Sequence, residues 1–429
     1  MELKVIRGNE RKEHTKKPLQ YWEKDSYIHA LEKPNQRLIL NEQIVNRVKQ
    51  LSDVNILDIS LPNNEKGEHG TIVAEYKQVK YEFNYYYFAH ETSNILSYQR
   101  QFFTQEEMEE IGKTSMALTS FMRFEKDARD SYILQLKLLH AIMPDALAYE
   151  DESAEKYMNK RWVELVVNSK YPCEFDSLYS VQAIIANDDD IWLHTHGLAR
   201  CNIAELEILN AKTDTYNSYY SIISTLANRV LEDTYDKEKD YCYIGQCDED
   251  LPIVVRKVIW TRGILKYEQD ILGTEKDRET GHNSETELIF LLGDDEKLYK
   301  LSEIDEALKD NPILFISNSE TQRMSDVAIE RFSYVRNIMA LNDENYAVIV
   351  KMGIKTDNGD SYDNKEHIWF ELENIAGDTL DLTLTQEPYD IKDLHQGDRG
   401  KYLLADLTNW VIYTPNGTVT PESVYLLDL

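Results

Sequence analysis

The chain has 429 residues, of which 42% are hydrophobic and 10% aromatic; this composition excludes a wholly disordered protein, and the length suits about three domains. Its 77 acidic side chains outnumber its 47 basic ones, which leaves a formal net charge of −30. A surface of this charge repels phosphate groups and therefore argues against binding to nucleic acid or to anionic membranes.

The first 215 residues are predicted to form an arm and an α+β domain. Residues 1–60 combine a polar, mixed-charge arm with a short helix over 37–51, where apolar residues recur at helical spacing. Residues 61–215 mix strand and helix patterns irregularly, which favours α+β over a regular alternation of parallel strands and helices. The strands are expected over 71–88, 162–167, 179–186 and 191–196, and the helices after a capping box at Thr104 and over 126–143.

The remaining residues are predicted to form two further parts. Residues 216–340 are a second α+β segment, either separate from the first or continuous with it, and they include a strong helix pattern over 320–339. From 341 to 429, short strands alternate with Gly and Asn-Gly turns, which predicts a small all-β, barrel-like domain. Trp369 and Trp410 are expected to anchor its core. The predicted fold class is therefore α+β, with mixed or antiparallel sheets and packed helices, followed by a small β domain.

The sequence favours a cytoplasmic location. Residues 1–17 are charged throughout and lack the apolar core of about 7–15 residues that a secretion signal needs. No uncharged apolar run approaches the roughly 18 residues of a membrane span. The four cysteines are too few and too scattered for a disulfide framework in a chain of this length. We therefore expect a cytosolic protein with reduced thiols and no membrane partner.

One constellation of polar residues carries a chemical hypothesis. His194 and His196 are two positions apart on a predicted strand, so their side chains share one face, and Glu205 and Glu207 have the same spacing on the following segment. If the chain turns between them, the segments pair antiparallel, and burial of the apolar residues on one side places the histidines and glutamates together on the other. Four such side chains are candidate ligands of one divalent metal such as zinc, or candidate groups for acid–base catalysis.

The same residues also have a purely structural interpretation. Histidine and glutamate form stable cross-strand hydrogen bonds without a metal, and Arg200 is a further candidate partner for a glutamate. The HxH spacing alone is a weaker signal than the motifs of most zinc hydrolases. We therefore favour, without a cofactor, a binding or structural role for His194, His196, Arg200, Glu205 and Glu207.

Several segments resemble bacterial protein families of unknown function. Segments 135–139 and 179–181, together with WLHTHGLARC at 192–201 and ELEIL at 205–209, resemble one such family over roughly residues 60–330. HIWFE at 367–371, GD at 397–398 and NWVIY at 409–413 resemble a second family, a small β module that is often appended to other domains. The HTHGL…ELEI pair is also similar to suppressor-of-fused domains, a group that includes presumed immunity proteins. Neither of the two family resemblances implies an established activity.

Three functions stay open on the sequence. The favoured one is a cytosolic, acidic binding protein of the immunity or toxin-neutralising type, whose partner is a protein with a basic surface. The second is a metal-dependent hydrolase that uses His194, His196, Glu205 and Glu207. The third is a scaffold without chemistry of its own.

Overall fold

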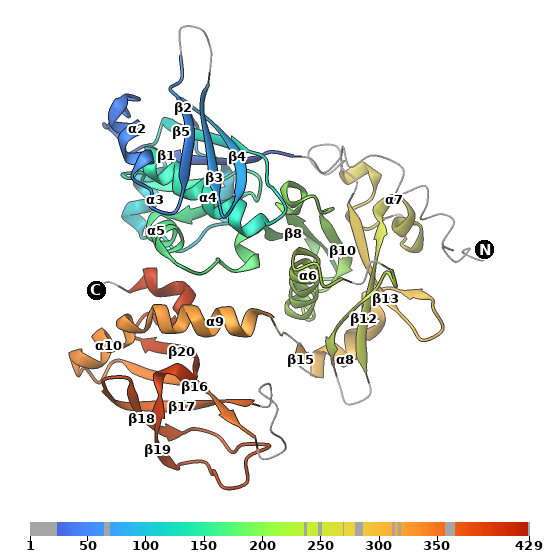
Figure 1. Cartoon of the computed structure of the whole chain (residues 1–429). Helices are drawn as coiled ribbons and strands as arrows, with labels where there is room; N and C mark the ends of the chain where they lie inside the picture. The colour runs from blue at the N-terminus through green and yellow to red at the C-terminus, as the bar shows by residue number, and fades with distance from the viewer. Residues whose placement is uncertain are drawn as a thin grey trace. The chain divides into compact units, whose positions relative to one another are not determined.

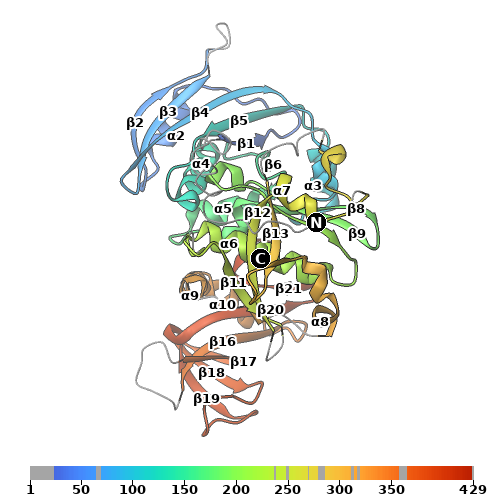
Figure 2. The same cartoon turned by 90° about the vertical axis from the view of Figure 1, so that its right-hand side faces the viewer.

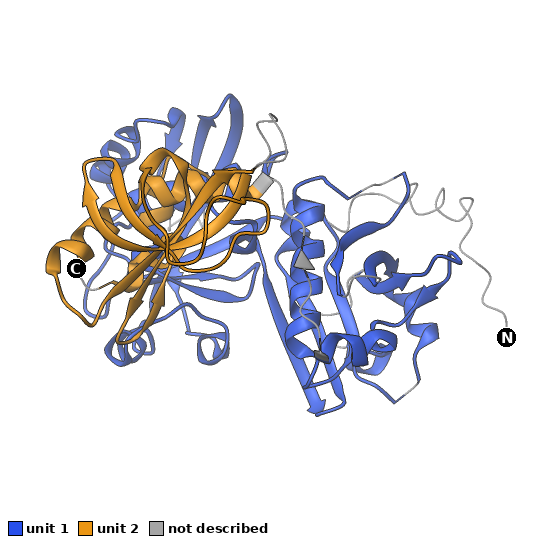
Figure 3. Cartoon of the chain, turned by 90° about the horizontal axis from the view of Figure 1, so that it is seen from below, with its two compact units in different colours: residues 1–163, 173–316 blue, residues 164–172, 317–429 orange. Residues whose placement is uncertain are grey.

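The protein contains two compact units, coloured separately in Figure 3: residues 1–163 with 173–316, and residues 164–172 with 317–429. The expected α+β class is confirmed, because both units combine helices with mostly antiparallel sheets. The second unit begins its main segment at residue 317, not at about 341 as the turn pattern predicts. The computed structural model describes residues 24–63, 69–235, 238–247, 251–268, 270–278, 286–310, 314–315, 319–356 and 365–427.

The first sheet has seven antiparallel strands in the order β2-β3-β4-β5-β1-β6-β7, of which β1 to β5 are labelled in Figure 1. The expectation that a polar arm precedes the helix of residues 37–51 is wrong for β1, which lies between β5 and β6 and buries Ile28 and Ala30 completely. The strands are β1 (Ser26–Leu31), β2 (Asn55–Ser60), β3 (Gly70–Tyr76), β4 (Val79–Ala89), β5 (Met116–Met122), β6 (Ala148–Asp151) and β7 (Lys156–Asn159).

Helices α2 (Glu42–Lys49), α3 (Gln105–Ile111) and α4 (Ala128–Ile142) accompany this sheet. α4 forms within the predicted range 126–143 and lies along one face of the sheet (Figure 2), where it buries Leu134, Leu138 and Ile142, which recur at steps of four. α3 begins at the predicted capping box, in which Thr104 Oγ1 accepts from the Glu107 N–H at 3.2 Å and the Glu107 carboxylate accepts from the Thr104 N–H at 2.8 Å.

Helix α5 (Lys160–Asn168) occupies the segment for which the sequence predicts a strand over 162–167. Trp162, Val163 and Val166 are buried there, and this spacing fits one side of a helix. A short apolar run fits a strand and a buried helix equally well, so periodicity alone does not separate the two.

The second sheet is mixed and has the order β15-β11-β12-β13-β10-β9-β8, with β14 beside β13. β10 and β13 run parallel, and the other neighbours pair antiparallel. Helices α6 (Tyr216–Leu231), α7 (Trp260–Gly263) and α8 (Asp305–Asp310) belong to the same part of the chain. The strands are β8 (Ser180–Asn187), β9 (Asp190–His196), β10 (Leu206–Ala211), β11 (Cys242–Gln246), β12 (Pro252–Ile259), β13 (Glu287–Leu292), β14 (Leu298–Tyr299) and β15 (Leu314–Phe315).

The second unit holds a six-stranded antiparallel sheet in the order β19-β18-β17-β16-β20-β21. Within its described residues the sheet is open rather than a barrel, because β19 and β21 end the strand order without pairing with each other. No helix in the described part of the chain is long and apolar enough to cross a membrane. The strands are β16 (Ala347–Lys355), β17 (Lys365–Ala376), β18 (Thr379–Leu384), β19 (Arg399–Leu403), β20 (Leu407–Thr414) and β21 (Gly417–Val419).

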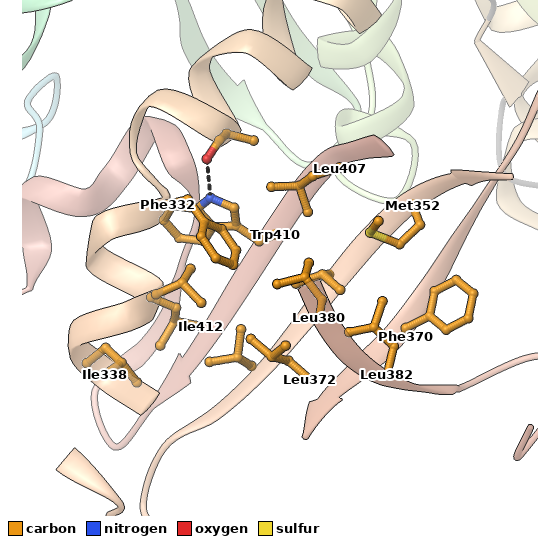
Figure 4. Close-up of a cluster of buried hydrophobic side chains, with 14 of the residues drawn as sticks. Phe332, Ile338, Met352, Phe370, Leu372, Leu380, Leu382, Leu407, Trp410 and Ile412 are labelled. Atoms are coloured by element: carbon orange, nitrogen blue, oxygen red, sulfur yellow. Dashed lines mark hydrogen bonds between the residues drawn. The ribbon is translucent and has the colours of Figure 1, made fainter. Parts of the chain in front are cut away.

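Two helices complete the core of this unit, which explains both its boundary and its open sheet. α9 (Ser319–Glu330) and α10 (Phe332–Leu341) replace the single helix expected over 320–339, and Phe332 and Ile338 pack with the strands (Figure 4). Trp410 is fully buried as predicted, and its indole N–H donates to the carbonyl oxygen of Ala328 at 2.9 Å. Trp369, in contrast, is only half-buried. Because helices cover the apolar side of the sheet, burial does not require it to close.

Candidate functional site

The predicted strand pair that carries the histidine and glutamate residues is present. β9 and β10 are antiparallel, with His194 opposite Glu207 and Leu193 opposite Ile208. Leu193, Leu206 and Ile208 are each at most 1% exposed. The predicted burial of the apolar positions is therefore confirmed, and His194 and Glu207 share the other side of the pair.

Glu207 is engaged by an arginine that the sequence analysis did not single out. Both guanidinium nitrogens of Arg278 donate to the Glu207 carboxylate, and the Nη1–Oε1 distance is 2.9 Å. The two side chains are 2% and 1% exposed, and the guanidinium lies 4.2 Å from the ring centre of Trp260. Such a two-pronged pair satisfies both carboxylate oxygens. Nothing local in the sequence links two residues that are 71 positions apart.

Glu205 lies just before β10 begins, and its carboxylate is held on the Thr195 side of the strand pair, which is the side opposite the histidines. One of its carboxylate oxygens accepts from the backbone N–H groups of Gly197 and Ala199, each at 2.9 Å, and the other accepts from Thr195 Oγ1 at 2.7 Å. Gly197 has a φ of +112°, and a Cβ placed there would lie 2.5 Å from the carbonyl oxygen of Leu178. Glu205 therefore fixes a tight turn that only glycine allows.

The two histidines are neighbours, but the four predicted residues do not form one ligand set. The rings of His194 and His196 lie edge to face, 4.8 Å apart. His196 Nδ1 is 3.4 Å from the Glu155 carboxylate, a residue of the β6–β7 turn. Among the described residues, no three His, Cys, Asp or Glu side chains are grouped so that they could hold a metal ion. The expected cluster of two histidines with two glutamates is thus corrected by the contacts of Glu205 and Glu207.

Arg200 forms its ion pair with Asp151 rather than with a glutamate. Its Nη1 and Nη2 donate to the two Asp151 oxygens at 2.7 and 2.9 Å, and Nη2 also donates to the carbonyl oxygen of Leu178 at 2.6 Å. Arg200 is 2% exposed and Asp151 is 0% exposed. Burial alone would lower the pKa of Arg200, but the Asp151 carboxylate raises it above its ordinary value, so the guanidinium stays charged.

The cysteine beside this ion pair is not activated as a nucleophile. Burial raises the pKa of Cys201 to about 12, with a smaller opposing effect from Arg200. A reactive cysteine needs a lowered thiol pKa, so Cys201 carries a neutral thiol at physiological pH.

A cavity of about 240 Å³ lies close by and is lined in part by Arg100, Lys156, Trp162 and Tyr220. Burial lowers the pKa of Lys156 to about 8. Its ammonium donates to the carbonyl oxygens of residues 177 and 179 at 2.7 and 3.1 Å. Lys156 thus ties β7 to the segment that leads into the second sheet, which is a structural use of its charge.

Comparison with protein families assigns the first unit. A model described as "Protein of unknown function (DUF4026) N-terminal" matches residues 26–173, and one described as "Protein of unknown function (DUF4026) C-terminal" matches residues 181–290. Together they match more than half of the 429 residues. The chain belongs to the DUF4026 family. No curated protein matched it, and no solved structure did.

The resemblance to tandem domains of unknown function is therefore confirmed, with different bounds. The N-terminal DUF4026 domain contains the first sheet, and the C-terminal domain contains β9 to β12 and most of β8 and β13. The C-terminal match lies within the region of roughly residues 60–330 that resembled one family, the N-terminal match extends it back to residue 26, and residues 341–429 lie outside both matches. The comparisons do not show a similarity to suppressor-of-fused domains. Arg200 and Asp151 join the two DUF4026 domains.

The turn held by Glu205 gives a test of its role. Glu205→Ala should lower the free energy of unfolding by about 2–3 kcal/mol, because two backbone N–H groups and one hydroxyl lose a buried acceptor. Glu205→Gln retains one carbonyl acceptor, so we expect a loss of about 1 kcal/mol. Urea unfolding of the three proteins at pH 7 measures both values. Equal losses for Ala and Gln would contradict the hydrogen-bonding role.

The pH dependence of the same variants has a definite sign. Burial raises the pKa of Glu205 above its ordinary value of 4.5, and the bonds from Thr195 and the backbone only partly oppose this effect. The ionised form therefore costs stability above the raised pKa, and this cost disappears as the pH falls towards 4.5. As the pH falls from the raised pKa of Glu205 towards 4.5, wild type should therefore gain stability relative to Glu205→Gln, because glutamine does not titrate.

Proposed function

We propose that this DUF4026 protein is a cytosolic binding protein of the immunity or toxin-neutralising type, whose partner is a protein with a basic surface. The net charge of −30 carries the proposal. An acidic surface attracts a basic partner over long range and disfavours nucleic acids.

The contacts at the candidate site support binding over catalysis. Glu207 is neutralised by Arg278, and Glu205 holds the turn that follows β9. A hydrolase that used both glutamates as ligands would have to break these contacts first. The metal-dependent hydrolase therefore has less support than the binding protein.

Association with the partner should be steered by charge. We expect the association rate constant to fall about tenfold or more between 0.05 and 0.5 M salt, while the dissociation rate constant changes much less. The reason is that the screening length shrinks from about 14 Å to about 4 Å over this range. A pull-down at 0.05 M salt supplies the partner, and surface-based kinetics across a salt series supply the two rate constants.

Two results would count against the proposal. A neutral or acidic partner, or an association rate that does not change with salt, would show that the acidity serves solubility alone. Stoichiometric zinc or manganese in the purified protein, lost on His194→Ala, would instead favour the hydrolase.

A further inference from the structure

A continuous row of aromatic rings crosses one face of the first sheet. Its members, here called the aromatic strip, come from β1, β4 and β5 and from residues next to these strands and β3. Neighbouring ring centres are 5.2–6.3 Å apart, and each ring contacts at least one other. The strip consists of Tyr27, His29, His69, Tyr86, Phe88, His90 and Phe121.

Strand alternation explains why these rings lie on the side away from α4. In β4, Phe83 and Tyr85 are fully buried on one face, whereas Tyr86 and Phe88, at the even-numbered positions of the other face, are half-buried. Side chains of successive residues point to opposite faces of a sheet. Phe121 of β5 is half-buried too, on the same side. His29 is only 6% exposed, so the accessible part of the strip consists mainly of the half-buried rings of Tyr27, Tyr86, Phe88 and Phe121. Half-buried rings on three adjacent strands form a surface, whereas a single exposed aromatic residue would need no explanation.

Carboxylates flank this surface. Glu82 precedes the rings on the same face of β4 and is exposed. The Glu152 side chain is 62% exposed and contacts His29 Nε2 at 2.8 Å. Burial is the largest cause that raises the pKa of Tyr27, and the charges of Asp25, Tyr86 and Glu152 add to it in that order. The carboxylates of Asp25 and Glu152 therefore lie close to the Tyr27 ring. Arg123 Nε is 3.4 Å from the Asp25 carboxylate and pairs with this acid.

Aromatic faces next to carboxylates match the chemistry of lysine and arginine side chains. A cation above an aromatic ring is attracted to the electron-rich face, and nearby carboxylates add charge-assisted hydrogen bonds. Phosphate groups of nucleic acid would be repelled by the same acids. We propose that the aromatic strip is the docking surface on which this protein holds the lysine and arginine side chains of a basic protein partner. The inference rests on the proposed function and names the surface that performs it.

A dye-labelled octa-arginine peptide is a direct probe of this surface, because it carries the cations without a folded partner. Fluorescence anisotropy with the full-length protein at 0.05 M salt gives its dissociation constant. We expect Tyr86→Leu and Phe121→Leu each to weaken binding by about three- to tenfold, since leucine keeps apolar bulk but has no aromatic face. Tyr86→Phe keeps that face and should bind like wild type.

Matched controls separate the strip from the general acidity of the protein. Tyr389→Leu is the control for the loss of one aromatic ring, because Tyr389 belongs to the second unit and is 91% exposed. Glu82→Gln and Glu152→Gln should each weaken binding by about two- to threefold. Glu306→Gln removes the same charge from a side chain that is 91% exposed on α8, and it should have less effect. Unchanged urea unfolding midpoints show that every variant is folded.

The outcomes distinguish this inference from the proposed function. If the strip variants and the controls bind the peptide equally, or if wild type does not bind it at all, the docking surface is wrong. A basic partner with charge-steered kinetics would then still support the binding function. A neutral partner would overturn the proposed function and, with it, the docking role, even if the peptide binds. Self-association detected by sedimentation, and abolished by Phe121→Leu, would assign the strip to a second copy of the chain and overturn the inference.

Discussion

Replacing Arg200 with methionine should lower the free energy of unfolding of the first compact unit by about 3–5 kcal/mol. The substitution leaves the Asp151 carboxylate, which is 0% exposed, without its positive partner. It also removes the donor to the carbonyl oxygen of Leu178. Urea unfolding followed by hydrogen exchange of peptides from β6 and β9 measures the loss within this unit.

A second substitution tests whether the loss comes from the uncompensated charge. In the double variant Arg200→Met with Asp151→Leu, no buried charge is left, and much of the stability should return. Arg123→Met is the matched control, because the Arg123 side chain is 53% exposed and lies 3.4 Å from Asp25. An exposed pair of this kind contributes about 1 kcal/mol or less. A double variant that is no more stable than the single one would show that packing, rather than charge, makes Arg200 important.

Replacing Trp410 with alanine should lower the free energy of unfolding of the second unit by about 3–5 kcal/mol. Trp410 is fully buried against both the helices and the sheet, so alanine leaves a large cavity. The carbonyl oxygen of Ala328 also loses its indole donor. Hydrogen exchange of peptides from β16 and β20 during urea unfolding reports on this unit.

Two further substitutions separate cavity formation from the lost hydrogen bond. Trp410→Phe keeps most of the apolar volume and should cost about 1–2 kcal/mol. Trp369→Ala removes the same kind of side chain from a half-buried position, where Lys351 Nζ lies 5.5 Å from the ring centre. We expect less than about 1.5 kcal/mol there. Equal losses for Trp369→Ala and Trp410→Ala would contradict the assignment of Trp410 as the anchor of this core.

Features that depend on neighbours in the sequence were predictable without a structure. The steps of four in α4 and the capping box at Thr104 are local, because one helical turn contains all the atoms involved. The same holds for β9 and β10, which a short turn connects. With a period of two, burial of Leu193 decides which face every other side chain of the pair adopts.

The partners of the charged side chains depended on the tertiary structure. Arg200 is 49 positions from Asp151, and Arg278 is 71 positions from Glu207. The chain has 77 acidic side chains, and its sequence does not indicate which of them folding brings to a given arginine. The metal hypothesis assumed that both glutamates were available, and the contacts of Glu205 and Glu207 with distant or turn residues were not visible in the sequence.

The limits of the second unit, and the surface that is left uncovered on the first sheet, were also decided by packing. The apolar side of 320–339 predicts a helix, but only the fold shows that α9 and α10 cover the sheet of residues 347–419. In β4 the sequence predicts a strand, yet apolar and aromatic residues occupy both of its faces. Which face α4 buries, and which becomes the aromatic strip, is fixed by the helix that packs there, because an apolar side chain has no preference for one face until a neighbour excludes water from it.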